Sequence, residues 1–129
     1  MLDTNIVIHA RDSNVAVLDT LAKLQGATVI SALVLAELQR GLRRGDTDAA
    51  RREARLSLLL RQIEVLPFDR VAAETYGRII ASLGWVRGRD FDRMIAAHAI
   101  STKSILVTAN ADDFRDIPGL EIEAWTLAP

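Results

Sequence analysis

Apolar residues recur along this chain with two alternating periods, which predict a succession of helices and strands. Residues 15–24 are apolar at every third position, which is typical of an amphipathic helix. Residues 105–108 form a short apolar run, which is typical of a strand buried on both faces. Helices are expected over 15–24, 31–43, 46–61, 69–83 and 91–101, with a helical turn at 112–114. Strands are expected within 2–8, where the first one ends in a turn, and over 27–30, 63–68, 105–108 and 120–125.

This alternation predicts an α/β sandwich with a mostly parallel central sheet flanked by helices. No repeat, low-complexity tract or linker interrupts it. The length of 129 residues suits one ordinary domain, so we expect a single domain over residues 1–129. In folds of this kind, ligand sites form beyond the carboxyl ends of the parallel strands.

Composition narrows the chemistry. Half of the residues are apolar and 26% are charged, a balance typical of a folded globular chain. The absence of cysteine excludes disulfides, zinc–thiolate sites and cysteine nucleophiles. A net charge of −1 provides no overall basic field of the kind that marks many nucleic-acid binders. No apolar run is long enough to span a membrane and no secretory signal is recognisable, so a cytoplasmic protein is expected.

Several acidic residues occur where burial would be costly without a partner. Asp3 ends the first predicted strand, Glu37 lies in an otherwise apolar helix, and Asp92 begins the most apolar helix. Asp112 and Asp113 follow the strand 105–108 directly. Convergence around a shared cation would satisfy all of them. Because the ligands would be oxygen atoms, the cation would be Mg²⁺ or Mn²⁺, which serves phosphodiester hydrolysis.

Each of these residues also has a simpler explanation. The alternatives are helix N-caps for Asp3 and Asp92, an ion pair with Arg40 for Glu37, and turn positions for Asp112 and Asp113. His98 is explained best as a core histidine, and His9 receives no catalytic role. The acids therefore indicate a cation site only when they are considered together.

Four motifs in this chain resemble those of the PIN-domain ribonucleases, in particular the VapC-type toxins of bacterial toxin–antitoxin pairs. They are MLDTNIVI at 1–8, SALVLAELQRG at 31–41, DRMIAAHA at 92–99, and LVTANADDF at 106–114 followed by IPGLEIEAW at 117–125. Together they span nearly the whole chain. In the family a few more residues precede the first motif, so the first strand is expected to be short here.

The resemblance implies a set of site residues. The catalytic acids of the family fall on Asp3, Glu37, Asp92 and Asp113. The family implies that Asp3 and Asp92 ligate metal, and that Glu37 and Asp113 do so directly or through water. The polar neighbours of the site fall on Thr4, Asn5, Ser31, Thr108, Asn110 and Asp112.

The resemblance also implies a three-layer PIN-like sandwich and a Mg²⁺-dependent (or Mn²⁺-dependent) endoribonuclease that cleaves structured RNA, tRNA or rRNA, to inhibit translation. Its expected partners are a second copy of the chain and a cognate antitoxin, with operator DNA reached only through the antitoxin and no membrane. The leucines of helices 31–43 and 46–61 also favour a dimer. The alternatives are a non-catalytic or DNA-directed module of this fold, or a Mg²⁺-binding receiver-like signalling domain. A receiver domain would place paired acids, where this chain has Asp3 alone, after its first strand.

Overall fold

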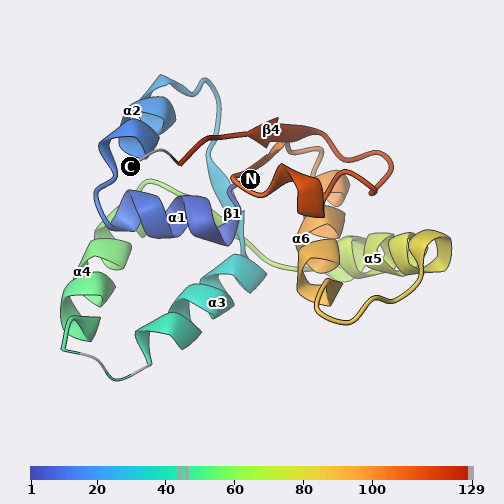
Figure 1. Cartoon of the computed structure of the whole chain (residues 1–129), viewed down its shortest axis with the longest axis horizontal. Coiled ribbons are helices and arrows are strands. Elements are labelled where there is room, and N and C mark those ends of the chain that lie inside the picture. Colours follow the sequence, from blue (N-terminus) through green and yellow to red (C-terminus); the bar gives the residue numbers. More distant parts are fainter. Residues whose placement is uncertain (44, 46, 128–129) are drawn as a thin grey trace.

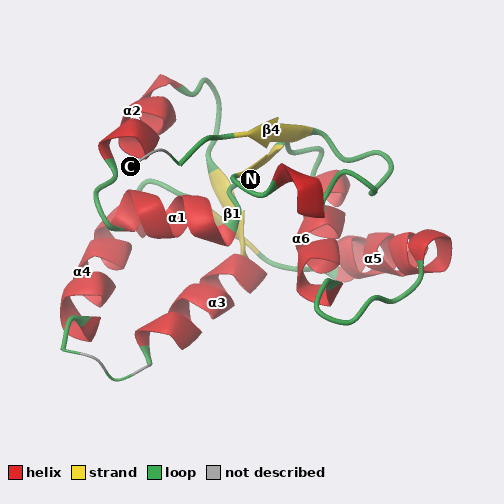
Figure 2. Ribbon diagram, viewed as in Figure 1, coloured by secondary structure: helices red, strands yellow, loops and turns green. Residues whose placement is uncertain are grey.

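The computed structural model describes residues 1–43, 45 and 47–127, and it alternates helices with short strands (Figures 1 and 2). In chain order the elements are α1 (Thr4–Arg11), α2 (Val15–Lys23), β1 (Val29–Ser31), α3 (Ala32–Leu42), α4 (Ala49–Leu60), β2 (Glu64–Leu66), α5 (Arg70–Leu83), α6 (Asp90–Ser101), β3 (Leu106–Thr108), the 3-10 helix η1 (Ala111–Asp113) and β4 (Ile122–Ala124).

The first three residues join two small parallel sheets into one. Strand β1 pairs with β2, and β3 pairs with β4, both in parallel. The N–H of Leu2 donates to the carbonyl of Val29 at 2.9 Å, and the N–H of Asp3 donates to that of Val107 at 2.9 Å. The N–H of Val107 donates in turn to the carbonyl of Met1 at 2.8 Å. The order across the sheet is therefore β2, β1, residues 1–3, β3, β4.

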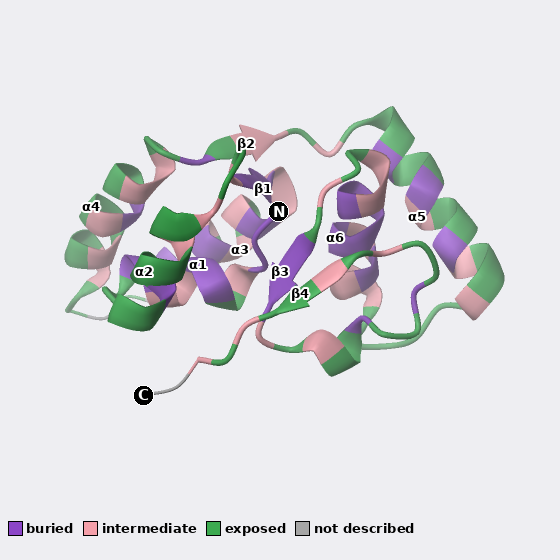
Figure 3. Cartoon of the chain, turned by 90° about the horizontal axis from the view of Figure 1, so that it is seen from above, coloured by how far each residue is buried: buried purple, intermediate pink, exposed green. Residues whose placement is uncertain are grey.

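Helices cover both sides of these strands, as Figure 3 shows. Helices α1–α4 lie on one side, and α5 and α6 pack against each other on the other side. The central strands β1 and β3 are buried along their whole length, which explains why they are apolar on both faces. The predicted three-layer α/β sandwich with a parallel sheet is confirmed.

Side-chain hydrogen bonds cap the N-termini of α2, α3 and α5. Asn14 accepts a hydrogen bond from the N–H of Val17 at the start of α2, and Asp69 accepts one from that of Ala72 at the start of α5. Ser31 ends β1 and caps α3 by accepting from the N–H of Leu33 at 3.1 Å. Each cap satisfies an N–H group that has no partner within its helix.

The expectation of a strand and turn within residues 2–8 is wrong for most of that segment. Asp3 caps helix α1, which begins at Thr4. The β-branched run Ile6-Val7-Ile8 is typical of strands. Here the helix buries Ile6, Val7 and Ala10 in the core, and this packing overrides the local preference.

The leucines of α3 and α4 contribute less exposed surface than the sequence predicts. In α3, Leu38 and Leu42 are buried, and in α4 only Leu58 belongs to the strongly exposed apolar side chains of the described residues, at 59%. The start of the predicted helix at Asp46 lies outside the described residues. Within the described residues, no helix is both long and apolar enough to cross a membrane.

Candidate active site

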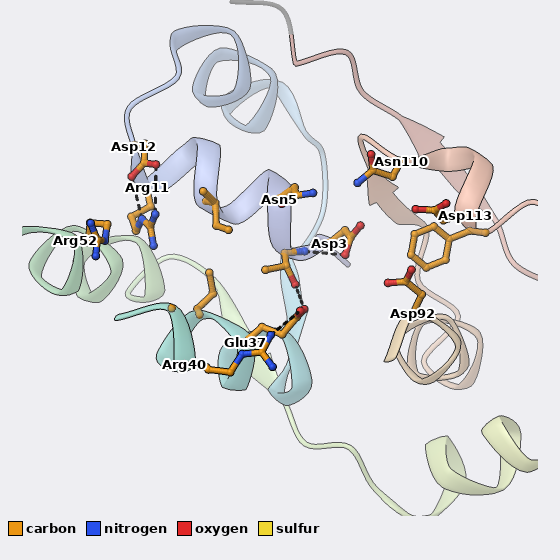
Figure 4. A pocket seen from close by; sticks show the side chains of 15 residues that line it. Asp3, Asn5, Arg11, Asp12, Glu37, Arg40, Arg52, Asp92, Asn110 and Asp113 are labelled. Carbon is orange, nitrogen blue, oxygen red and sulfur yellow. Dashed lines mark hydrogen bonds and ion pairs between the residues drawn. The ribbon is translucent and has the colours of Figure 1, made fainter. Parts of the chain in front are cut away.

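The predicted acids meet in one pocket of about 500 Å³ beyond the carboxyl ends of the central strands (Figure 4). Asp3 comes from the segment 1–3 that precedes α1, Glu37 from α3, Asp92 from the first turn of α6, and Asp113 from η1. The other lining residues are Thr4, Asn5, Ile8, Arg11, Asp12, Leu38, Arg40, Gly41, Arg52, Asn110 and Phe114. Four segments far apart in the sequence therefore each bring one carboxylate to the same space.

Asp3 is a buried carboxylate held by both of its oxygens. Its Oδ1 accepts from the N–H of Thr4 at 2.8 Å, and its Oδ2 accepts from the hydroxyl of Thr108 at 2.8 Å. The Thr108 hydroxyl itself accepts from the N–H of Asn110 at 3.0 Å. Burial raises the pKa of Asp3, the two hydrogen bonds oppose that rise, and the charge of Asp113 adds to it.

Thr4 links two of the acids. Its N–H donates to Asp3, and its hydroxyl donates to Oε1 of Glu37. The other oxygen of Glu37 lies 4.0 Å from Nη2 of Arg40, so the ion pair considered from the sequence is present but loose. Thr4 thus fixes the carboxylates of Asp3 and Glu37 relative to each other.

Asp92 differs from these two acids because it is not held by hydrogen bonds. No hydrogen bond from a described side chain reaches its carboxylate. Burial raises its pKa to about 6, and the charges of Asp3, Asp113 and Glu37 add to the effect, which Arg89 partly opposes. Asp92 therefore has free oxygens and binds a proton more readily than an ordinary aspartate.

The two adjacent acids of η1 point in different directions. Asp113 lines the pocket and acts electrostatically on Asp3 and Asp92. Asp112 is 84% exposed and pairs with Arg115 at 2.6 Å, and it does not line the acid pocket. The structure therefore brings Asp113, and not Asp112, to the acid pocket. Thr4 and Thr108 bond to the acids, and the amides of Asn5 and Asn110 line the space beside them.

Ser31, predicted as a polar neighbour of the site, does not line the pocket. Its hydroxyl bonds to Nδ1 of His98 at 2.7 Å in the core, where the ring of Phe68 meets the imidazole edge to face. Burial lowers the pKa of His98. The buried imidazole holds the start of α3 against α6, which is the core role that the sequence favours for it.

Part of the pocket wall is cationic, and its residues come from separate segments that no single sequence motif groups together. It comprises Arg11 of α1, Arg40 of α3 and Arg52 of α4. Thr4, Ile8 and Arg11 lie four and three residues apart, and this spacing places them on one face of a helix. The spacing of these three residues is visible in the sequence, but it places them on one face only if residues 4–11 form a helix.

The donors of this pocket suit a hard divalent cation. They are carboxylate and amide oxygens, which Mg²⁺ prefers over nitrogen and sulfur ligands. Within the described residues, no three acidic or histidine side chains are close enough together to enclose an ion. Mg²⁺ commonly binds through one or two carboxylates and keeps several waters, so an open site of this kind fits it.

Burial of Asp92, together with the charges of the neighbouring acids, predicts a gain in stability when this carboxylate is neutralised. Because the folded state raises the pKa of Asp92 from 3.8 to about 6, stability without metal should fall as the pH rises through that window. Asp92→Asn should therefore stabilise the metal-free protein at pH 7, by on the order of 1–2 kcal/mol after allowing for partial exposure. Urea unfolding in EDTA at pH 7 and pH 4 measures this gain, which should vanish at pH 4. Asp112→Asn is the matched control, and an equal gain there would contradict the role of crowding.

Comparison with known proteins agrees with this geometry. The family model of the PIN domain matches residues 1–120. Ribonuclease VapC2 of Rickettsia felis is 36% identical over 132 residues, which cover 97% of this chain and 96% of the relative. The tRNA(fMet)-specific endonuclease VapC of Shigella flexneri is 36% identical over 130 residues, covering 98% and 97%. The structure of VapBC2 from Rickettsia felis bound to a promoter DNA fragment superposes with a TM-score of 0.86 at 31% identity, covering 97% of both chains.

The chain therefore belongs to the PIN-domain family. Within that family it belongs to the VapC-type ribonuclease toxins of toxin–antitoxin systems, since its relatives over nearly the full length are VapC proteins.

Proposed function

We propose that this protein is a divalent-metal-dependent endoribonuclease that hydrolyses phosphodiester bonds of structured RNA and thereby inhibits translation. The observation that carries the proposal is the convergence of Asp3, Glu37, Asp92 and Asp113, from four separate segments, on one open pocket. Such a cluster has little structural use, because like charges in a partly buried space repel one another.

The residues divide into held and free carboxylates. Asp3 and Glu37, fixed by Thr4 and Thr108, present oxygens in set positions and would hold the cation together with Asp92 and Asp113, directly or through water. When bound, Mg²⁺ or Mn²⁺ would neutralise charge on the scissile phosphate and acidify water.

Asp92 is the general base in this proposal. Its oxygens accept no hydrogen bond from a described side chain, and in the metal-free protein burial and the neighbouring acids raise its pKa to about 6, above that of an ordinary aspartate. It would take the proton of a water that attacks the phosphorus in line, and the 3′ oxygen would leave. The amides of Asn5 and Asn110 would donate hydrogen bonds to phosphate or ribose oxygens in the pocket.

The proposed substrate class is tRNA, with rRNA as the second candidate. The Shigella flexneri relative is a tRNA(fMet)-specific endonuclease and aligns over 97% of its length. The proposed partners are a cognate antitoxin, through which operator DNA would be reached, and a second copy of this chain. The solved relative from Rickettsia felis is VapBC2 bound to a promoter fragment.

The ends of the RNA products test this mechanism. Attack by water leaves a 5′-phosphate and a 3′-hydroxyl, whereas attack by the ribose 2′-hydroxyl leaves a 2′,3′-cyclic phosphate. We expect purified protein with Mg²⁺ to cut a tRNA into fragments whose new 5′ ends are phosphorylated. Mass spectrometry of the fragments distinguishes the two chemistries, and a cyclic phosphate would refute the water mechanism. A protein that binds RNA without cutting it would favour the non-catalytic alternative.

A further inference from the structure

The pocket has two regions of opposite charge. Asp3, Asp92 and Asp113 form its acidic end, whereas Arg11 and Arg52 lie at the other end (Figure 4). Arg40 also lines the pocket. The three arginines come from three different helices, α1, α3 and α4. We call Arg11, Arg40 and Arg52 the arginine wall.

Arg40 keeps donors available to a ligand, whereas Arg11 is held in place by an ion pair. The side chain of Arg40 is 76% exposed, and its contact with Glu37 is 4.0 Å long, so this contact engages its guanidinium only weakly. The side chain of Arg11 is only 9% exposed and forms a bidentate ion pair with Asp12. Its Nε lies 3.0 Å from Oδ1, and its Nη2 lies 3.3 Å from Oδ2. These two hydrogen bonds fix the plane of the Arg11 guanidinium.

A pocket with acids at one end and arginines at the other suits an anionic chain better than a single anion. RNA repeats a negative phosphate at every nucleotide, and guanidinium groups bind phosphate through two parallel hydrogen bonds. A strand along the pocket would place the phosphate to be cleaved at the acidic end and a neighbouring phosphate at the arginines. The acids repel a phosphate that arrives without a cation, so attraction at the opposite end sets the direction of approach.

We propose that Arg40 and Arg52, supported by Arg11, form a binding subsite for the phosphate that flanks the cleaved bond. The inference rests on the proposed ribonuclease function and extends it to how the RNA backbone is positioned relative to the acids. These are positioning residues: they hold the RNA backbone and do not touch the reacting atoms. Their loss should therefore weaken RNA binding and raise KM, with kcat nearly unchanged.

Binding of a labelled single-stranded oligoribonucleotide tests the subsite separately from cleavage. All variants carry Asp92→Asn and are measured in EDTA by fluorescence anisotropy over a range of salt concentrations. Arg40→Gln and Arg52→Gln should each raise Kd about tenfold, as expected for a charge-assisted contact. Each should also lower the slope of log K against log salt by about 0.7, the value for one phosphate contact on a single strand.

Matched variants make the result specific. Arg51 lies beside Arg52 on α4, is exposed and does not line the pocket, so Arg51→Gln should change Kd less than about twofold. Arg52→Lys should keep the salt slope and lose part of the affinity, because lysine keeps the charge without the fork. Thermal unfolding of every variant establishes that the fold is intact.

The outcomes separate this inference from the proposed function. Unchanged RNA affinity and salt slope in Arg40→Gln and Arg52→Gln would overturn the subsite, as would an absence of RNA binding by the parent. If these variants weaken only the complex with the antitoxin, the arginine wall is a protein contact and the inference is wrong. With Asp92 restored and Mg²⁺ present, a failure of the parent to cut RNA would refute the ribonuclease function, whereas the binding result would still stand.

Discussion

Replacing Asp92 by asparagine is expected to lower kcat/KM for RNA cleavage by a factor on the order of 100 or more. The amide keeps the shape of the side chain but neither carries the charge nor accepts a proton as a carboxylate does. Like that of Asp113, the carboxylate of Asp92 accepts no hydrogen bond from the described side chains, so its oxygens are open to water or a cation in the pocket. Single-turnover cleavage of a labelled tRNA measures the loss.

The neighbouring pair in η1 provides the control for this prediction. Asp113→Asn should lower the cleavage rate strongly, because Asp113 lines the acid pocket. Asp112→Asn, one residue earlier, should leave it within about twofold, because Asp112 faces Arg115 in solvent and an exposed ion pair contributes little. Equal losses in both variants would contradict the assignment, and full activity of Asp92→Asn would remove Asp92 from the mechanism.

Removal of divalent metal by EDTA is expected to abolish cleavage, and addition of Mg²⁺ or Mn²⁺ is expected to restore it. The same ions should stabilise the fold by binding the native state alone. At a concentration of about 100 times Kd, this amounts to about 2.7 kcal/mol. Thermal unfolding with and without Mg²⁺ measures the effect independently of activity.

Asp3→Asn provides the matched measurement for the metal. Its amide can still occupy the position between Thr4 and Thr108, but it reduces the negative charge of the acidic end. The rise in Tm with Mg²⁺ should therefore shrink or disappear in this variant. A rise equal to that of the parent would show that the ion binds elsewhere, and undiminished cleavage in EDTA would exclude a role for metal.

The order of helices and strands was predictable from the sequence because most elements have a clear apolar period and a cap. Residues 15–23 and 70–83 each follow a side chain that accepts from the third N–H beyond it. Helix α1 was not predictable in this way. Its Ile6-Val7-Ile8 run favours a strand locally, and only burial against the rest of the fold, a long-range effect, makes it a helix.

The acids of the site were predictable, whereas their surroundings were only partly so. Glu37 and Asp92 are conspicuous because they interrupt apolar helices. Asp112 and Asp113 are adjacent aspartates, and only the direction of each side chain on η1 decides which of them lines the acid pocket. Ser31 is polar and close in sequence to the site, but its hydroxyl turns to His98 in the core. The arginine wall depends on how α1, α3 and α4 pack, which no local pattern encodes.

The hydrogen bonds of residues 1–3 with Val107 have a consequence for protein synthesis. Asp3 can take its place in the pocket only after Val107 has been made, because its N–H donates to the carbonyl of that residue at 2.9 Å. Ribosomes add about 5–20 residues per second, so the first acid waits for several seconds on the nascent chain. During this interval the growing polypeptide holds no assembled acid pocket. The enzyme we propose would therefore become able to cut RNA only as its own synthesis nears its end.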